Sequence, residues 1–376
     1  MGKQKGFSRK RLVTGFAAGC WKLYGKIHKN GWKNKYAGFM LKHAKNGKAW
    51  SREWKQLTEY LNNTEPEMLK GCRWFFLKLK LFRFRVFCGA QMHLDSLDQI
   101  HAPYHLLRRL VTGNRSNFVA EMICTREAMD ICREKHRAAE YWDDWLDRNW
   151  KELSPEHPMT GEGLERILNG KTKLVVKPVA TSGGAGVEVV DTAERFASPE
   201  ECLEYLNGLE GKLIVEEFVE QKGFIHTMNP SSVNTVRIVT VRRPNGEITV
   251  VNAFLRVGQE GAPVDNVSRG GCFYVIDHRT GMMRKGRDEH AQCIPQLRKG
   301  KDPAPVPVPR WEEAVEFCRS AHRHAPDGLN YVGWDVSISD DRLRLIEMNS
   351  RPGWSQPYSG KEYPWKEMRK LLDEFE

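Results

Sequence analysis

Two acidic side chains and an amide near the C-terminus have the spacing of a metal site. Asp335 lies in one apolar run, and Glu347 and Asn349 lie in the next. Residues two apart on a strand share a face, so Glu347 and Asn349 should point the same way. The turn-forming residues 339–341 predict a β-hairpin that brings all three side chains together. Three oxygen ligands on rigid strands suit Mg²⁺, which proteins usually share with nucleotide phosphates.

The alternative is a polar strand face that is open to water. We favour the metal site because most residues around the two acids are apolar, which predicts that both runs are buried. A buried carboxylate needs a partner, and a cation would supply one.

A lysine followed by a glycine-rich loop would supply the phosphate half of such a site. Lys177 ends an apolar run, and Ser182, Gly183, Gly184 and Gly186 follow before the next one. Glycines let the backbone fold over an anion with its N–H groups pointing inward, and the lysine adds a point charge. No Gly-Lys-Ser/Thr sequence closes the loop, which excludes a Walker A motif. A plain turn is the alternative, and the acids downstream favour a nucleotide.

A strand that ends in acids and an aromatic residue is the candidate for adenosine binding. The apolar residues 213–215 lead, after Glu216, into Glu217, Phe218, Val219 and Glu220. An adenine ring would lie against Phe218, and Glu220 or Glu217 would bind the ribose hydroxyls. Solvated acids at a strand end are the competing interpretation.

The order of these parts resembles the ATP-grasp superfamily. A lysine precedes a glycine-rich strand pair, Val-Glu-Glu-Phe follows, and Asp and Glu-x-Asn come last. Further segments resemble the sugar-transfer-associated ATP-grasp proteins, which are found with capsule and surface-polysaccharide genes: Ser232–Ile238, Phe254–Gly258, Val264–Asn266, Gly270–Gly271 and Glu347–Gly353. The resemblance covers roughly residues 135–364. It implies an α/β (α+β) ATP-grasp fold, in which two β-sheet lobes clamp ATP.

The resemblance also implies roles for individual residues. Lys177 and the loop at 182–186 would hold phosphates, residues 217–220 the adenosine, and the carboxylate hairpin the Mg²⁺. Arg237 and Arg256 would face the γ-phosphate and a forming acyl phosphate. Lys135 is the candidate for the further upstream lysine that family members often carry, and residues 148–150 (Arg-Asn-Trp) are the candidate for their Arg-aromatic pair after a helix. Asn266 belongs to a polar loop that would cover the γ-phosphate, unless this loop is only a glycine-bearing turn.

The implied activity is ATP-dependent ligation that forms a carbon–nitrogen bond. A carboxylate would attack the γ-phosphate, and an amine would then displace phosphate from the acyl phosphate. The expected substrates are an amino acid or amine and a sugar acid or surface-glycan precursor, as in polysaccharide biosynthesis. Two alternatives stay open: an ATP-grasp kinase that acts on a hydroxyl, and a non-catalytic membrane- or polyanion-binding protein with a relict nucleotide site.

Charge is distributed unevenly along the 376 residues, which carry a net charge of +11. Between Met1 and Ser51 there are thirteen Lys or Arg, no acid, and several interleaved aromatics. Residues 1–52 would therefore suit an anionic membrane surface or a polyanionic glycan, and the solvated face of a helical layer is an equal alternative. No specific nucleic-acid partner is predicted.

The nine cysteines form no Cys-x-x-Cys pair, which argues against zinc and against a disulfide scaffold. Reduced thiols and the need for ATP indicate a cytoplasmic protein, and attachment to the inner face of the membrane is left open. We expect a basic, mainly helical region at 1–115, a small lobe with the glycine-rich loop at 116–220, and a large lobe with the Mg²⁺ site at 221–376.

Overall fold

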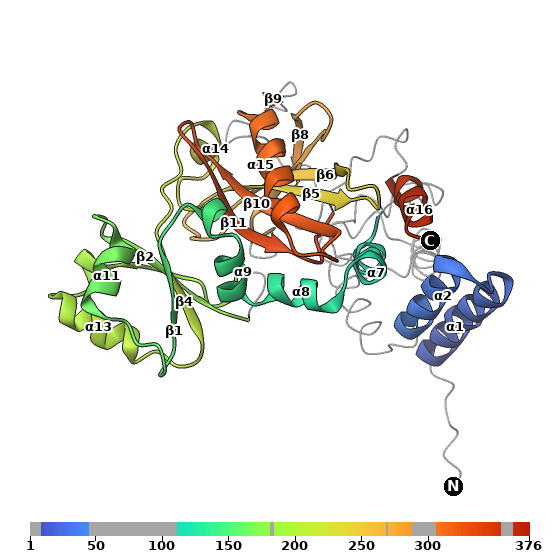
Figure 1. Cartoon of the computed structure of the whole chain (residues 1–376), viewed down its shortest axis with the longest axis horizontal. Helices are drawn as coiled ribbons and strands as arrows, with labels where there is room; N and C mark the ends of the chain where they lie inside the picture. The colour runs from blue at the N-terminus through green and yellow to red at the C-terminus, as the bar shows by residue number, and fades with distance from the viewer. Residues whose placement is uncertain (1–8, 45–110, 181–183, 268–269, 288–305, 355–363) are drawn as a thin grey trace, which may run out of the picture.

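Two antiparallel β-sheets form the body of the protein, and helices surround them (Figure 1). The computed structural model describes residues 9–44, 111–180, 184–267, 270–287, 306–354 and 364–376. The predicted combination of helices with two separate sheets is therefore present. The sheets differ in size, and each has its own apolar core.

The smaller sheet has four strands: in spatial order β1 (Trp150–Leu153), β4 (Leu213–Glu217), β2 (Lys173–Pro178) and β3 (Glu188–Asp191). Three helices accompany it: α11 (Gly161–Leu168), α12 (Thr192–Arg195) and α13 (Pro199–Asn207). Leu174 and Val176 alternate with more exposed residues along β2, so one face of the sheet packs against Ile167 of α11 and Leu206 of α13. The side chain of Thr160 caps the start of α11 by accepting from the backbone N–H of Gly163.

The larger sheet has seven strands: in spatial order β11 (Leu343–Asn349), β10 (Tyr331–Ile338), β5 (Thr235–Arg242), β6 (Ile248–Val257), β7 (Cys272–Ile276), β8 (Met282–Arg287) and β9 (Val306–Pro307). The short helix α14 (Phe224–Met228) precedes it, and α15 (Trp311–His324) packs on one face. All eight residues of β10 are buried, because the strand lies inside the sheet and is covered on both sides. Trp334 and Val336 pack in the core with α15, so Asp335 points to the opposite face.

Four helices join the N-terminal part to the sheets: α7 (Gly113–Ile123), α8 (Arg126–Arg133), α9 (Lys135–Tyr141) and α10 (Asp143–Leu146). The last three contribute to the core of the larger sheet, where Trp142 meets the Trp334 ring edge-on at 5.7 Å and donates to the Ala321 carbonyl at 3.0 Å. The predicted boundary had instead placed these residues in the small lobe. An amphipathic helix does not encode which of two sheets it will cover, so its sequence alone could not decide this.

The N-terminal segment forms a helical hairpin of α1 (Arg9–Ile27) and α2 (Gly31–Ala44). Aromatic side chains attach it to α7 and to the C-terminal helix α16 (Pro364–Glu374): Tyr36 lies 4.8 Å from Phe118, and Trp32 lies 6.5 Å from Trp365. The predicted helical character is confirmed for residues 9–44, and residues 45–110 lie outside the described part. No helix in the described ranges is both long and apolar enough to cross a bilayer.

Candidate active site

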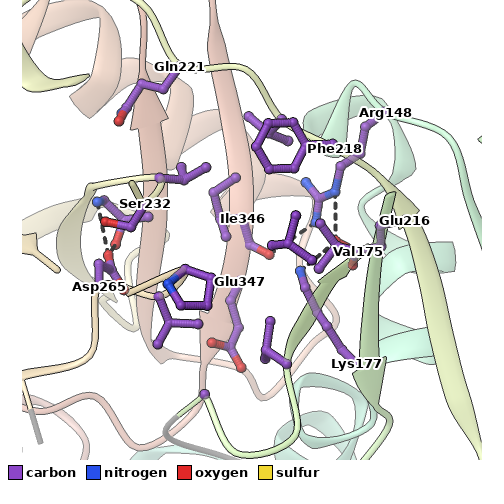
Figure 2. A pocket seen from close by; sticks show the side chains of 18 of the residues that line it. Arg148, Val175, Lys177, Glu216, Phe218, Gln221, Ser232, Asp265, Ile346 and Glu347 are labelled. Atoms are coloured by element: carbon purple, nitrogen blue, oxygen red, sulfur yellow. Dashed lines mark hydrogen bonds and ion pairs between the residues drawn. The ribbon is translucent and has the colours of Figure 1, made fainter. Parts of the chain in front are cut away.

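A cavity of about 490 Å³ is lined by residues of both sheets (Figure 2). Its wall includes most of the predicted site residues that the structure describes: Lys135, Lys177, Gly184, Glu217, Phe218, Val219, Glu220, Arg256, Asn266 and Glu347. Gly186, Arg237, Asp335 and Asn349 are not part of this wall, and Ser182 and Gly183 lie outside the described residues. The size of the cavity is typical of a small-molecule or cofactor site.

The predicted carboxylate hairpin is confirmed. Strands β10 and β11 pair antiparallel, and Asp335 lies directly opposite Glu347. The Asn349 amide donates to the Asp335 carboxylate at 3.2 Å. The register shifts just after this pair, because Val336 is opposite Leu345 and Ile346 is an extra residue. This β-bulge lies next to Glu347, a position at which bulges commonly aim side chains toward a site.

Two arginines hold the Asp335 carboxylate, which is fully buried. Arg237 donates from Nε and Nη2 to its two oxygens at 2.6 and 2.7 Å, and Arg256 donates from Nη2 at 2.9 Å. Burial acts to raise the pKa of Asp335, but the two guanidinium groups outweigh it and hold the pKa below its usual value. The immediate partners of Asp335 are therefore arginines, and its direct ligation of Mg²⁺ stays a prediction.

The carboxylates around these arginines carry a surplus of negative charge. Arg256 also pairs with Asp265 at 3.3 Å, so two acids share the two guanidinium groups, and the charge of a third acid, Glu347, also acts on them. Burial raises the pKa of Asp265 and of Glu347, and the neighbouring Asp335 charge raises both further. The Glu347 carboxylate forms no ion pair or hydrogen bond with the described residues. A cation bound at Glu347 would relieve this surplus.

The donor set at this end of the cavity fits Mg²⁺ better than a softer metal. Glu347 and Asn349 offer hard oxygen ligands, with Asp335 behind them. Within the described ranges, no three His, Cys, Asp or Glu side chains are arranged to hold a metal on their own. Mg²⁺ usually needs only one or two protein carboxylates, since waters and substrate phosphates complete its coordination.

At the opposite side of the cavity, a buried glutamate holds two cations. Lys177 Nζ lies 2.5 Å from Glu216 Oε2, and Arg148 Nε donates to the same oxygen at 3.0 Å. Burial opposes ionisation of Glu216, but the two cations prevail and lower its pKa to about 2. Figure 2 shows the three side chains together, across the cavity from Glu347. Lys177 thus lines the cavity as predicted, with a counterion already in place.

Lys135 lies between these two groups of charges. It lines the cavity at the start of α9, and burial lowers its pKa, while the charge of Glu347 acts to raise it. Lys177 and Glu216 also influence it. Both predicted lysines therefore contribute positive charge to one cavity, as phosphate binding would require.

The two candidate ribose ligands have different surroundings. Glu217 is buried and accepts from Lys171 at 2.8 Å, Asn169 at 3.2 Å and Asn149 at 3.1 Å. Glu220 is exposed and lines the cavity beyond Phe218. The donors around Glu217 leave it little capacity for a ligand, which favours Glu220 of the two alternatives.

The far end of the glycine-rich loop meets the loop that carries Asn266. Gly184 has a φ of +69°, and a Cβ atom at this position would collide with the Asn266 side-chain oxygen. Gly186, with a φ of +73°, would place its Cβ 2.7 Å from Pro178. Both positions need glycine, for backbone conformation and for close approach. Gly184 therefore lines the same cavity as Asn266 of the predicted γ-phosphate loop.

Sequence analysis passed over Glu216 and Asp265 as site residues, whereas Arg148 belongs to the Arg-aromatic candidate that the family resemblance singled out. Glu216 is adjacent to Glu217 in a buried strand, so the two acids point to opposite faces, and either could have faced the ligand. Glu216 lies opposite Val175 of β2, the strand that carries Lys177, but the sequence alone does not give the pairing register of the two strands. Asp265 was seen only as part of a polar loop.

Comparison with known proteins shows which family the chain belongs to. Residues 156–358, more than half of the chain, match the model of the sugar-transfer associated ATP-grasp family. The protein belongs to this family. The resemblance inferred from the motifs is thereby confirmed, and with it the fold class of two β-sheet lobes that the structure displays.

Individual relatives are distant. The chain is 28% identical over 184 residues to a probable alpha-L-glutamate ligase of Syntrophotalea carbinolica, a match that covers 49% of this chain and 44% of the relative. Among solved structures, the D-alanine-D-alanine ligase from Coxiella burnetii superimposes with a TM-score of 0.40 at 13% identity, covering 67% of this chain and 60% of the other. The L-amino acid ligase from Bacillus licheniformis gives 0.38 at 13% identity, with coverage of 70% and 54%.

Proposed function

We propose that this ATP-grasp protein is an ATP-dependent carboxylate–amine ligase that works through an acyl phosphate. The observation that carries the proposal is the division of charge across one cavity. Lys177 provides positive charge on one side, Glu347 contributes on the other a carboxylate with no ion pair among the described residues, and Lys135 lies between them. The distant relationship to a probable glutamate ligase supports the ligase class.

In this proposal, the residues of the small sheet bind the nucleotide. Phe218 and Val219 would contact the adenine, and Glu220 the ribose hydroxyls. Lys177, Lys135 and the glycine-rich loop would hold the phosphates, with Asn266 closing over the outermost one. This order follows the wall of the cavity, in which residues of β2, β4 and the 263–266 loop take part.

The residues of the large sheet would serve the transferred phosphoryl group. Glu347 and Asn349 would hold Mg²⁺, and the Asp335 carboxylate would lie behind them. When bound, Mg²⁺ neutralises charge that develops on the β- and γ-phosphates. Arg256 lines the cavity and is the better placed of the two arginines to contact the acyl phosphate. Arg237 lies behind it and fixes Asp335.

The proposed substrates are an amino acid or amine and a sugar acid or surface-glycan precursor. The activated carboxylate oxygen would bond to phosphorus as the γ-phosphoryl group leaves ADP. The amine nitrogen would then bond to the carbonyl carbon as phosphate departs, and the amine would lose a proton. The products are an amide, ADP and phosphate in equal amounts.

The decisive experiment measures ADP and phosphate release against panels of amino acids and sugar acids, and identifies products by mass. A carboxylate labelled with ¹⁸O should pass one labelled oxygen to phosphate, which a direct hydrolysis of ATP would not do. Glu347→Gln should abolish both signals, and Glu312→Gln, the same change on the exposed face of α15, should leave them intact. A stable phosphoester without free phosphate would establish a kinase and reject the ligase.

A further inference from the structure

Helix α1 carries an apolar stripe that faces solvent. Phe16, Leu23 and Ile27 expose 54%, 60% and 67% of their surface, and in the described residues only Phe224 among other large apolar side chains is comparably exposed, at 36%. With Cys20, these residues follow each other at intervals of four, three and four. This spacing places all four on one face of the helix.

The stripe is separate from the face by which α1 packs on the protein. Ala17 and Trp21 are buried, and the Trp21 ring lies 5.4 Å from Tyr36 of α2. Gly25 allows the two helices to approach closely, since a Cβ there would lie 3.3 Å from Ala37. Because this inner face already secures the hairpin, the outer stripe is not needed to hold it.

Exposed positive charge lies on the same hairpin as the stripe. Lys22 and Lys26 are exposed on α1, and Lys29, Lys33 and Lys35 are exposed in the turn and on α2. The sequence has no acid before Glu53, and Asp373 and Glu376, which contact the hairpin, bind Trp32 on the buried side of α2. An apolar stripe with a basic rim is the pattern of a helix that lies in the plane of a membrane surface.

We infer that the α1–α2 hairpin docks the protein on an anionic lipid membrane, with α1 lying flat in the interface. Leu23 and Ile27 insert at the boundary of headgroups and acyl chains, and the lysines contact lipid phosphates. Binding of a soluble polyanion, such as an acidic glycan, would require only the lysines and not the apolar side chains. The exposed apolar stripe is the feature that selects a membrane as the partner.

The position of the hairpin is compatible with catalysis on the docked protein. Figure 1 shows α1 and α2 at one end of the molecule and the small sheet at the other. The residues that line the cavity come from the sheets, their loops and helices α8, α9, α10 and α14, and none from α1 or α2. Docking through α1 therefore leaves the cavity accessible, and membrane binding should be independent of ATP.

Co-sedimentation of the full chain with vesicles tests the inference. Binding is expected to vesicles of phosphatidylcholine with phosphatidylglycerol, and not to phosphatidylcholine alone. Leu23→Ser with Ile27→Ser, and Lys22→Glu with Lys26→Glu, should each lower the partition coefficient about tenfold or more. Arg319→Glu with Arg323→Glu makes the same charge change at the same spacing on α15 and should have little effect. Binding should also weaken as salt rises.

Two results would overturn the inference. One is absence of binding to anionic vesicles at low salt. The other is binding that the lysine changes abolish and the serine changes leave intact, together with equal binding to dextran sulfate; that pattern identifies a soluble polyanion. Leu23→Trp provides a check that does not depend on loss of function, since tryptophan favours the interface and should raise partitioning severalfold.

Discussion

Two buried carboxylates, one in each sheet, are held by two cations apiece, yet their surroundings differ. Glu216 in the small sheet has Arg148 and Lys177, and no second acid in the described part of the chain forms an ion pair with them. Asp335 in the large sheet has Arg237 and Arg256, which two further acids influence. The first group therefore has a surplus of positive charge and the second a surplus of negative charge. A nucleotide phosphate chain with its Mg²⁺ would match both across one cavity.

The largest effect is expected when the charge of Asp335, the acid between Arg237 and Arg256, is removed. Asp335→Asn would leave two buried guanidinium groups without their main acceptor. We expect the free energy of unfolding to fall by about 3–5 kcal/mol, as measured by urea denaturation. Wild-type stability in this variant would show that Asp265 and Glu347 can replace Asp335 as the counterion, and the assignment of roles within the group would be wrong.

Glu347→Gln should have the opposite effect on stability and a large effect on turnover. The raised pKa of Glu347 means that the folded protein binds the proton more tightly than the unfolded chain does. Its ionisation therefore reduces stability as pH rises from the usual range of a glutamate through the raised pKa. Removing the charge should stabilise the ligand-free protein at neutral pH. The barrier to ATP turnover should rise by about 2–4 kcal/mol. Thermal denaturation between pH 4 and 8, with ATPase rates, checks both.

Glu216 should be a main cause of the loss of folding stability at low pH. Its folded pKa is about 2, below the ordinary value of 4.5, so its stabilising contribution is complete above pH 4.5 and is lost as pH falls toward 2. The shift corresponds to about 3–4 kcal/mol. Glu216→Gln should flatten this part of the curve. Glu188→Gln, at an exposed ion pair of the same sheet, should not change it.

The smallest effect is expected for a change at Arg148, which connects the Glu216 group in the small sheet to the Asp335 group in the large sheet. Arg148 donates to Glu216 and also to the carbonyls of Leu345 and Ile346 at 2.5 and 3.2 Å, so it connects the small sheet to the bulge beside Glu347. Arg148→Lys keeps the charge and loses the fork of donors. Stability should fall by about 1–2 kcal/mol and kcat should decrease. Arg166→Lys, which affects a single surface contact with a backbone carbonyl, is the matched control.

Much of the site could be predicted because it depends on local periodicity. The carboxylate hairpin follows from alternating residues on two runs with a turn between them, and β10 and β11 pair as expected. Helices α15 and α16 likewise have long amphipathic patterns, which are strong sequence signals of a helix. The order of lysine, glycine loop and distal acids then sufficed to predict the family.

Contacts between distant segments could not be predicted in this way. Arg237 and Arg256 lie 98 and 79 residues before Asp335, and only strand pairing between β10, β5 and β6 brings them to it. Sequence alone made Asp335 a metal ligand, whereas the structure gives it two arginine partners. The same holds for Glu216, whose role depends on Lys177 and Arg148 reaching one of its oxygens.

The sequence by itself determined which residue types are available, which strand face each one occupies and which family they form. The tertiary structure decided which charges meet. The physical reason is that strand and helix periods act over a few residues, whereas the balance of charge in a buried cluster depends on sheet order and register. For this protein, that balance determines where a nucleotide and its cation would bind.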